Sequence, residues 1–339
     1  MSHLFAEYGL FLLKTVTVVL AIVVVIAFAA AAGRRATQDN LEVENLNRRY
    51  RSLGRVLRKA VLGKSERRKE GRAARKRDRA EEKSSSTRPR SFVLDFKGDL
   101  RARAVASLRE EISAVLDVAR DGDEVILRLE NQGGLVHEHG LAASQLARIR
   151  DRDLPLIVCV DKVAASGGYL MACVATKIHA APFAILGSIG VLAQIPNFNR
   201  LLDSHGVEVE QVMAGRYKRT VTMFGENTDE DREKLKSELE DVHRLFKAAV
   251  AAYRPGLDLE KLATGEHWYG TRALELGLAD ALATSDEILS ERAGTRDLYR
   301  VSYKIRQRLQ QRLMASADGV LERLESAAFA SRFESRLPR

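Results

Sequence analysis

The sequence predicts an α/β fold in which parallel strands alternate with helices. Short runs rich in Val, Ile and Leu occur at 92–96, 124–129 and 156–160 and are typical of buried strands. Between them, 101–119 and 141–149 carry apolar residues at helical spacing. Strands and helices that alternate at this spacing indicate βα units sharing one sheet.

The first element is an apolar stretch, residues 15–33, that contains no charged residue. As a helix it would span about 28 Å, close to the thickness of one hydrocarbon core. A cleaved signal peptide is the alternative, but the apolar part is long for one and the basic residues follow it. We therefore expect a single uncleaved anchor, with residues 1–14 as its N-terminal flank.

A basic segment follows, at residues 34–90. It holds 20 Lys/Arg and 8 Asp/Glu, a net charge of +12, whereas the whole chain carries +9, so the remainder is about −3. Residues 39–63 have helical spacing, and 64–90 reads as a solvated linker. Because 64–90 has no aromatic residue to stack on bases, we expect contact with anionic lipid headgroups and no nucleic-acid partner.

The charges beside the apolar stretch also bear on topology. Only Lys14 stands on its N-terminal side, whereas the other side is followed by Arg34, Arg35, Arg48, Arg49 and Arg51. The positive-inside rule then predicts that the large C-terminal part lies in the cytoplasm.

The most informative stretch begins with the strand at 156–160. It continues into Ala164-Ala165-Ser166-Gly167-Gly168 and then an apolar helix at 170–175. A strand, a tight turn and a helix would expose the oxygen of Ser166 at a helix N-terminus, where the next N–H can face a developing oxyanion. The alternative is a serine that only caps a glycine-rich helix start.

Two further groups of residues are candidates for a site. Gly133 and Gly134 follow the strand at 124–129 and can present bare backbone N–H groups to a ligand. His137 and His139 suggest a metal, but residues two apart do not share a helix face and no third ligand is evident, so we expect no metal. The two cysteines, Cys159 and Cys173, lie in apolar stretches and are expected to be buried thiols.

The rest of the chain continues the alternation of elements. We expect strands at 177–182 and 207–213, a short helix around Leu201, a long helix over 229–253 capped by Thr228 or Asp229, and a turn, helix and loop over 264–280. From Val301 onward, apolar residues recur at helical spacing. That tail could lie on a membrane, on a neighbouring subunit or on its own domain.

A serine nucleophile needs a base. His179 and His205 are candidates, although neither has a convincing Asp partner in the sequence. A lysine can replace histidine if it is uncharged, and burial favours the uncharged form of a lysine.

Three motifs that contain small residues, serine or lysine follow one another between residues 164 and 218. Ala164–Tyr169 is followed by Gly187-Ser188-Ile189-Gly190-Val191 and then by Gly215-Arg216-Tyr217-Lys218. With Gly133-Gly134 and the stretch from Trp268 to Asp280, the chain resembles the signal peptide peptidase A family of membrane-bound serine proteases. Its single anchor and basic segment most resemble the short, SohB-type inner-membrane members. The resemblance covers Ser91 to Leu282 and, more loosely, the anchor and linker.

The resemblance implies a role for each matching residue. Ser166 would be the nucleophile, and Lys218 would be the general base and then the acid toward the leaving amine. Ser188 would orient the amine of Lys218. The N–H groups of Gly134 and Gly167 would form the oxyanion hole, in which one donor is worth about 3 kcal/mol.

The resemblance also implies a fold, an activity and a location. The fold would be of the ClpP/crotonase type, with repeated ββα units over residues 91–298 and a tail over 299–339. The activity would be that of a membrane-anchored serine endopeptidase that cleaves unfolded or membrane-released peptides, such as signal-peptide remnants, through an acyl-enzyme and without a cofactor. We expect a homo-oligomer in the bacterial inner membrane. The family implies that the protease domain lies in the periplasm, whereas the charge asymmetry predicts the cytoplasm. We favour the periplasmic placement.

Two other classes of function remain open. One is a crotonase-like enzyme acting on an acyl thioester, for which an oxyanion hole alone would suffice. The other is an inactive membrane scaffold that binds peptides. The pair Ser166 and Lys218 argues against both.

Overall fold

The computed structural model describes residues 13–21, 40–84 and 88–305, and the chain divides into two units. One unit comprises Met1–Leu41 and Tyr303–Arg339, and its described part includes a helix over 13–21. No helix within the described ranges is long and apolar enough to cross a membrane. The expected anchor, residues 15–33, lies outside the described residues from position 22 onward, as do 1–12 and the tail 306–339.

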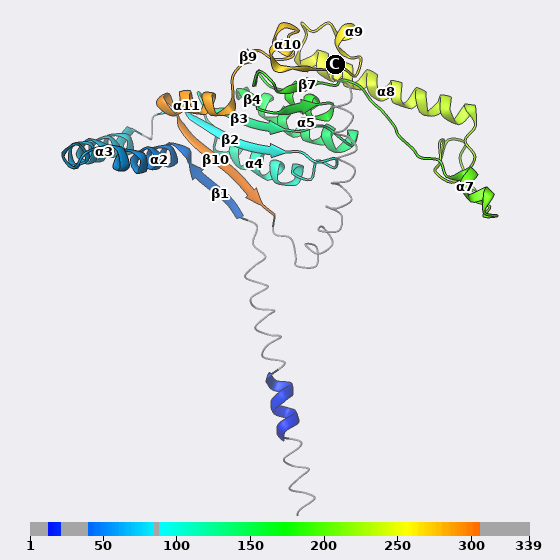
Figure 1. Cartoon of the computed structure of the whole chain (residues 1–339), viewed down its shortest axis with the longest axis horizontal. Coiled ribbons are helices and arrows are strands. Elements are labelled where there is room, and N and C mark those ends of the chain that lie inside the picture. Colours follow the sequence, from blue (N-terminus) through cyan, green and yellow to red (C-terminus); the bar gives the residue numbers. More distant parts are fainter. Residues whose placement is uncertain (1–12, 22–39, 85–87, 306–339) are drawn as a thin grey trace, which may run out of the picture. The chain divides into compact units, whose positions relative to one another are not determined.

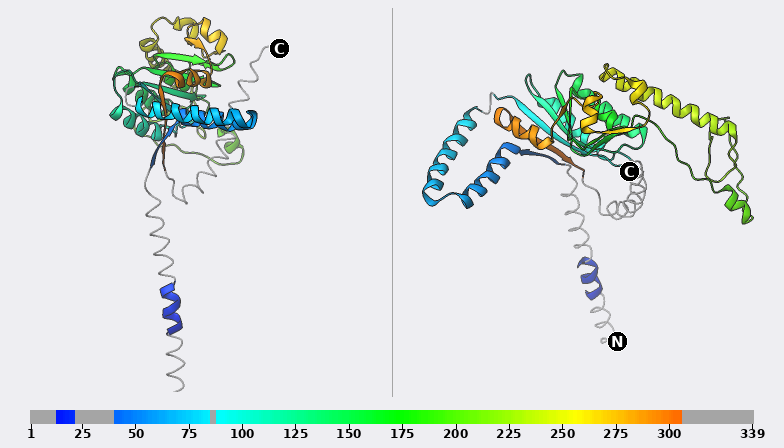
Figure 2. Two further views of the ribbon diagram at one scale, coloured as in Figure 1. Left: turned by 90° about the vertical axis from the view of Figure 1, so that its left-hand side faces the viewer. Right: turned by 45° about the horizontal axis from the view of Figure 1, so that its top comes forward.

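The other unit, Glu42–Ser302, is built on a seven-stranded sheet (Figures 1 and 2). All the neighbouring pairs from β10 to β9 are parallel, which confirms the predicted α/β class. The strands, in spatial order, are β1 (Asn40–Asn45), β10 (Asp297–Lys304), β2 (Arg90–Lys97), β3 (Glu124–Glu130), β4 (Leu156–Val160), β6 (Lys177–Ala180) and β9 (Ala281–Leu282).

Both faces of this sheet are covered. Successive side chains of a strand point to opposite sides, so each central strand contributes to an apolar cluster on each face. Phe92 and Leu94 belong to one apolar cluster, together with residues of α4 (Val105–Val118) and α5 (Val136–Arg150). Val93 belongs to a second cluster, with residues of α11 (Ser285–Thr295). Burial on both faces explains why the central strands read as continuous apolar runs.

A second sheet has three strands, β5 (Val163–Ala165), β7 (Ile185–Gly187) and β8 (His267–Tyr269). β5 and β7 are parallel, and β7 and β8 are antiparallel. Along the chain, the strands alternate between the two sheets: β4 and β6 lie in the larger sheet, whereas β5 and β7 lie in the smaller one. The short helix α6 (Gly167–Ala172) follows β5 directly.

Helices make up much of the remainder. The predicted helix over 229–253 is confirmed as α8 (Asp229–Tyr253), and Thr228 caps it by a reciprocal pair of hydrogen bonds with Asp231. The other helices are α2 (Leu46–Val61), α3 (Lys64–Ser84), α7 (Asn199–Ser204), α9 (Leu259–Leu262) and α10 (Gly270–Glu275).

Several expectations for local structure are corrected. Residues 40–45, within the expected helical stretch 39–63, form β1, and residues 267–269, within the expected turn, helix and loop over 264–280, form β8. Residues 64–84, expected to be linker, form α3, since their Ala, Arg, Lys and Glu residues are strong helix formers. Residues 207–213 form no strand, because no neighbouring strand pairs with them. Residues 297–304 form β10 beside β2, in a strand that crosses the expected boundary at 298, since apolar Leu298 and Val301 are buried there.

One buried carboxylate ties the beginning of β2 to the turn before β3. Asp123 accepts hydrogen bonds from the backbone N–H of Arg90 at 2.8 Å, from its Nε at 2.9 Å and from the backbone N–H of Arg120 at 3.1 Å. Burial alone would raise the pKa of Asp123, but these bonds, with the Arg90 charge, outweigh it and lower the pKa below its usual 3.8.

We therefore expect Asp123→Asn to lower the free energy of unfolding by about 2–4 kcal/mol at pH 7. A lowered pKa in the folded state stabilises the fold above the unfolded-state value and ceases to do so as the pH falls through the folded-state value. The difference from wild type should thus be constant near neutrality and shrink only below about pH 4. Urea unfolding at several pH values measures it, and exposed Asp117→Asn is the control. A difference independent of pH would contradict the assignment.

Candidate active site

Ser166 lies at the turn between β5 and α6, directly before the first residue of that helix, which confirms its predicted place at a helix N-terminus. Its φ is +51° and its ψ is −121°, a conformation that is uncommon for a residue with a side chain. Strained backbone of this kind is held by its surroundings and concentrates at functional sites.

Ser188 lies at the same end of the smaller sheet. β5 and β7 pair with Ala165 opposite Gly187, and the N–H of Ser166 donates to the Gly187 carbonyl at 2.8 Å. Ser188 is the next residue, it also has φ +51°, and its N–H donates to the Glu266 carbonyl at 2.6 Å. The parallel register therefore brings the two serines to matching positions.

Gly133 packs against the Ser166 turn, and Gly134 packs against the backbone of Leu100. Gly133 has φ +93°, and a Cβ there would lie 2.8 Å from the Cβ of Ser166. Gly134 has φ +156°, and a Cβ there would lie 2.1 Å from the carbonyl oxygen of Leu100. Neither position can hold a side chain without displacing backbone, so glycine is what permits this close approach.

Two backbone donors remain available beside Ser166. Within the described ranges, the N–H of Gly134 has no hydrogen-bond acceptor. Gly167 is the first residue of α6, where a helix supplies no internal acceptor for the N–H. Such donors can stabilise negative charge that develops on a carbonyl oxygen during attack.

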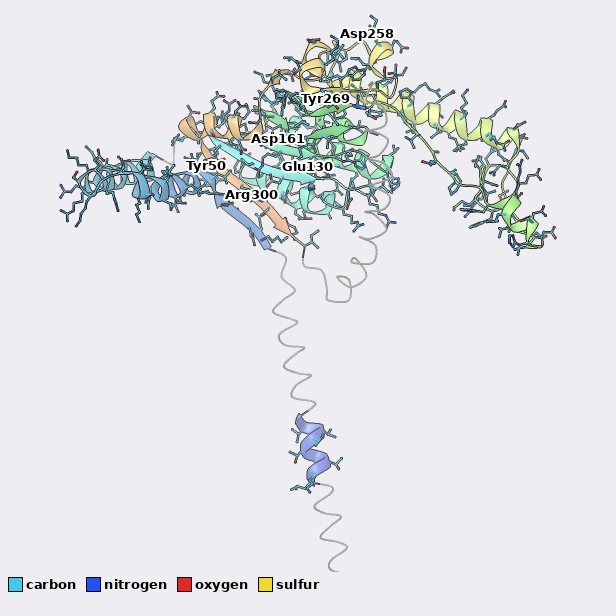
Figure 3. The ribbon with its side chains drawn as sticks, in the orientation of Figure 1. Tyr50, Glu130, Asp161, Asp258, Tyr269 and Arg300 are labelled. Atoms are coloured by element: carbon cyan, nitrogen blue, oxygen red, sulfur yellow. The ribbon has the colours of Figure 1, made fainter. Side chains whose placement is uncertain are left out.

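Asn131, which the sequence reading did not single out, connects these parts. It follows Glu130, labelled at the end of β3 in Figure 3, and it is buried. Its side-chain Oδ1 accepts the N–H of Gly133 at 2.9 Å. Its backbone N–H donates to Val163 at 2.8 Å, and its carbonyl accepts the N–H of Ala165 at 3.0 Å. The signal in the sequence was a polar residue between a buried strand and two glycines.

His139 packs under the same turn. It is fully buried, its Nδ1 lies 3.0 Å from the Leu135 carbonyl oxygen, and its Nε2 lies 3.2 Å from Asn131 Oδ1. Burial is the main influence on the pKa of its ring and lowers that pKa. A Cβ on Gly167 would lie 2.5 Å from its Cγ. In the described part of the chain, no three His, Cys, Asp or Glu residues gather as a metal site.

Lys218 makes no hydrogen bond to Ser166 or Ser188, both of which the structure describes. It is exposed, and its side chain makes no hydrogen bond or ion pair with any residue that the structure describes. Its N–H donates to the Gly215 carbonyl at 3.1 Å. The single chain therefore brings Ser166, Ser188, Gly134 and Gly167 to one place but does not hydrogen-bond Lys218 to either serine.

The segment that carries Lys218, residues 191–228, is stabilised locally. Asn197 donates to the carbonyls of Thr222 and Gly225, and the N–H of Phe198 donates to Met223. Many of its apolar side chains are nevertheless exposed, Leu192 by 62% and Val212 by 88%. The remaining exposed ones are Ile195, Phe198, Leu201, Val207, Val209, Met213, Tyr217, Met223 and Phe224.

Neither candidate histidine base is hydrogen-bonded to Ser166 in the described structure. His179 is on β6, where burial and then the charge of Lys177 lower its pKa. His205 ends α7, with its Nδ1 2.8 Å from the Leu201 carbonyl oxygen.

Comparison with known proteins matches most of the chain to one family of peptidases. The profile "Peptidase family S49 N-terminal" matches residues 3–146, and "Peptidase family S49" matches residues 148–298. The probable protease SohB of Haemophilus influenzae is 42% identical over 323 residues, 91% of this chain and 92% of that protein. The probable protease SohB of Buchnera aphidicola subsp. Acyrthosiphon pisum is 55% identical over 225 residues, 66% of this chain and 67% of that protein.

Two solved structures of one protease show a distant likeness to this chain. A mutant of the 1510-N membrane-bound stomatin-specific protease has 15% identity and a TM-score of 0.39, covering 60% of this chain and 85% of that one. A second mutant of that protease, in complex with a substrate peptide, has 16% identity and a TM-score of 0.37, and the match covers 62% of this chain and 83% of that one. The assignment rests on the sequence relatives: the chain belongs to peptidase family S49 and is a serine-type peptidase.

Proposed function

We propose that this peptidase is a membrane-anchored endopeptidase with a Ser166/Lys218 dyad, which cleaves unfolded or membrane-released peptides such as signal-peptide remnants. The observation that carries the proposal is the Ser166 turn: a serine at positive φ, pressed against Gly133, with two backbone donors beside it. The strands β4, β5, β6 and β7 alternate between the two sheets, with α6 following β5, and this order supports a ClpP/crotonase type of ββα domain.

The proposed chemistry has two halves. The Oγ of Ser166 attacks the scissile carbonyl carbon while the uncharged amine of Lys218 takes its proton. The N–H groups of Gly134 and Gly167 stabilise the oxyanion, and Lys218 returns the proton to the departing amine, leaving an acyl-enzyme. Water then attacks the ester carbonyl carbon while Lys218 takes its proton, the bond between that carbon and the Ser166 Oγ breaks, and Lys218 returns the proton to Ser166 as the acid product leaves. Ser188, whose backbone lies beside Ser166, orients the lysine amine.

We infer that the site is completed by assembly into a homo-oligomer. A lysine base must be uncharged, and removal from water is what disfavours its charge. Lys218 is exposed in the single chain, and its segment 191–228 carries exposed apolar side chains of the kind that protein interfaces bury. Packing of this segment against another subunit would cover those side chains and remove Lys218 from solvent.

Attachment to the bacterial inner membrane by residues 15–33 is part of the proposal. It is supported by the length and apolarity of that stretch. We favour a periplasmic protease domain, although the basic residues 34–90 would favour the cytoplasm. A reporter fused after Arg90 that is active only in the cytoplasm would overturn this choice.

The dyad is tested by hydrolysis of casein by the detergent-solubilised full chain. We expect Ser166→Ala and Lys218→Ala each to lose about 10⁴-fold or more in kcat while remaining folded. The wild-type rate should rise with pH as one base loses its proton. Exposed Ser144→Ala and Lys236→Ala are matched controls with wild-type rates. Cleavage that survives Ser166→Ala would contradict the nucleophile, and binding of casein without cleavage by wild type would indicate a scaffold.

Sharing of the site between subunits makes a separate prediction. Co-expression of Ser166→Ala with Lys218→Ala chains should restore part of the activity, because some sites then combine an intact serine with an intact lysine from the other chain. Each variant expressed alone is the control. Mixed oligomers that form, as shown by two different affinity tags, yet stay inactive would place both residues of a dyad on one chain.

Asn131 should act as a positioning residue for the oxyanion donors. Its backbone bonds to Val163 and Ala165 would survive a substitution by alanine, whereas the bond from the Gly133 N–H to its side-chain Oδ1, which holds the glycine loop, would be lost. We expect Asn131→Ala to lower kcat about 10²-fold with little change in KM, since misplacing a catalytic group by about 1 Å costs that much. The outward Gln132→Ala is the matched control. A fall in thermal stability with an unchanged kcat would show a purely structural role.

A further inference from the structure

Helix α2 has two chemically different faces. Leu46, Tyr50, Leu53 and Leu57 recur at intervals of four, three and four, which places them on one side of the helix. The remainder of the helix is strongly basic, and it contains no acidic residue; its cations are Arg48, Arg49, Arg51, Arg55, Arg58 and Lys59. A basic amphipathic helix of this composition is typical of segments that lie on membrane surfaces.

The domain covers only the beginning of the apolar face. Leu46 is 3% exposed, and the side chain of buried Asn47 bonds to Ala293, Arg296 and Leu298. Tyr50, labelled in Figure 3, is partly buried and packs against the apolar cluster that contains Leu46 and Val93.

Beyond Tyr50 the same face is uncovered. Leu53 is 60% exposed, Leu57 66% and Val61 74%, and Val56 beside them is 70% exposed. The fold thus fixes the start of α2 and leaves about two turns of apolar surface without a partner among the described residues.

We propose that α2 lies in the surface of an anionic lipid bilayer, with Leu53, Leu57 and Val61 among the acyl chains and its arginines at the phosphates. This rests on the membrane attachment proposed above, and it adds a second, charge-selective contact to the anchor. Its position fits, because α2 begins 13 residues after Gly33, so extended chain keeps it within about 45 Å of the anchor's end.

Charge decides between the possible occupants of this face. Arg49 pairs with Glu44 and Arg58 with Glu70, each at 3.7 Å, but the net charge of residues 34–90 remains positive, so a second copy of α2 would meet like charge. A nucleic acid would satisfy the charges but leave the apolar residues in water. An anionic bilayer meets both requirements, since its headgroups attract Lys and Arg and its acyl region takes apolar side chains.

The test uses the full chain in vesicles, with a fluorophore on a cysteine introduced at Leu57→Cys or, as the matched control, Arg55→Cys. The two positions are half a helical turn apart, so one faces the apolar side and the other the basic side. The native Cys159 and Cys173 are buried, and burial raises the pKa of each thiol to about 12, so they label poorly. Unsubstituted chain measures the residual labelling.

The vesicles contain phosphatidylcholine alone or mixed with phosphatidylglycerol, each with and without brominated acyl chains that quench on contact. In mixed vesicles we expect bromination to quench the label at Leu57→Cys at least about twofold and the label at Arg55→Cys little. High salt, or phosphatidylcholine alone, should weaken the quenching. Equal quenching at both positions, or quenching that ignores lipid charge, would overturn the proposal.

The remaining outcomes separate this proposal from membrane attachment itself. If the chain floats with vesicles but the label at Leu57→Cys is not quenched, attachment stands and the α2 proposal fails. If the chain floats with no vesicle, both fail. Excimer emission from pyrene at Leu57→Cys in vesicles would identify a second copy as the occupant and also overturn the proposal, whereas casein hydrolysis reports on the dyad independently.

Discussion

The site depends on the hydrogen bonds of one buried asparagine. Asn131 leaves the larger sheet at the end of β3 and pairs with the strand of the smaller sheet that leads into Ser166. Its side chain at the same time holds the loop of Gly133. One residue thereby ties the loop of Gly133 to the strand that leads into Ser166, so the geometry of the candidate site follows from how the two sheets meet.

The two sheets also explain why the serines match. In parallel strands, residues that follow a register pair leave the sheet at the same edge. Ser166 and Ser188 each come one residue after the pair Ala165 and Gly187, and they share the same φ. The smaller sheet therefore positions the proposed nucleophile and the residue proposed to orient its base, while the larger sheet is buried on both faces.

Much of the fold was predictable from local pattern. Continuous apolar runs gave β2, β3 and β4, and a capping threonine and a following proline gave α8, because these signals act within a few residues. The residues 207–213 alternate like a strand, but a strand needs a partner that the local pattern does not reveal. Residues 64–84 were misread because charge suggested a linker, whereas helix propensity and interleaved acidic residues support α3.

The site was predictable in part, and for different reasons. The motif around Ser166 predicts a serine at a helix start, and the structure has it there. Asn131 was not singled out from the sequence, and His139 was considered only as a metal ligand, since their contacts across the turn are not encoded by any spacing. The pairing of Lys218 with Ser166 stays a prediction, because Lys218 is exposed and its side chain bonds to no residue that the structure describes.

The exposure of residues 191–228 has a consequence for turnover. Irregular, exposed backbone is what proteolytic enzymes cleave first. In the proposed assembly this segment is covered, so an unassembled chain is the vulnerable form, and neighbouring copies of the same peptidase are among the enzymes that could cut it. Degradation of orphan chains would then keep the amount of this peptidase matched to the number of complete assemblies.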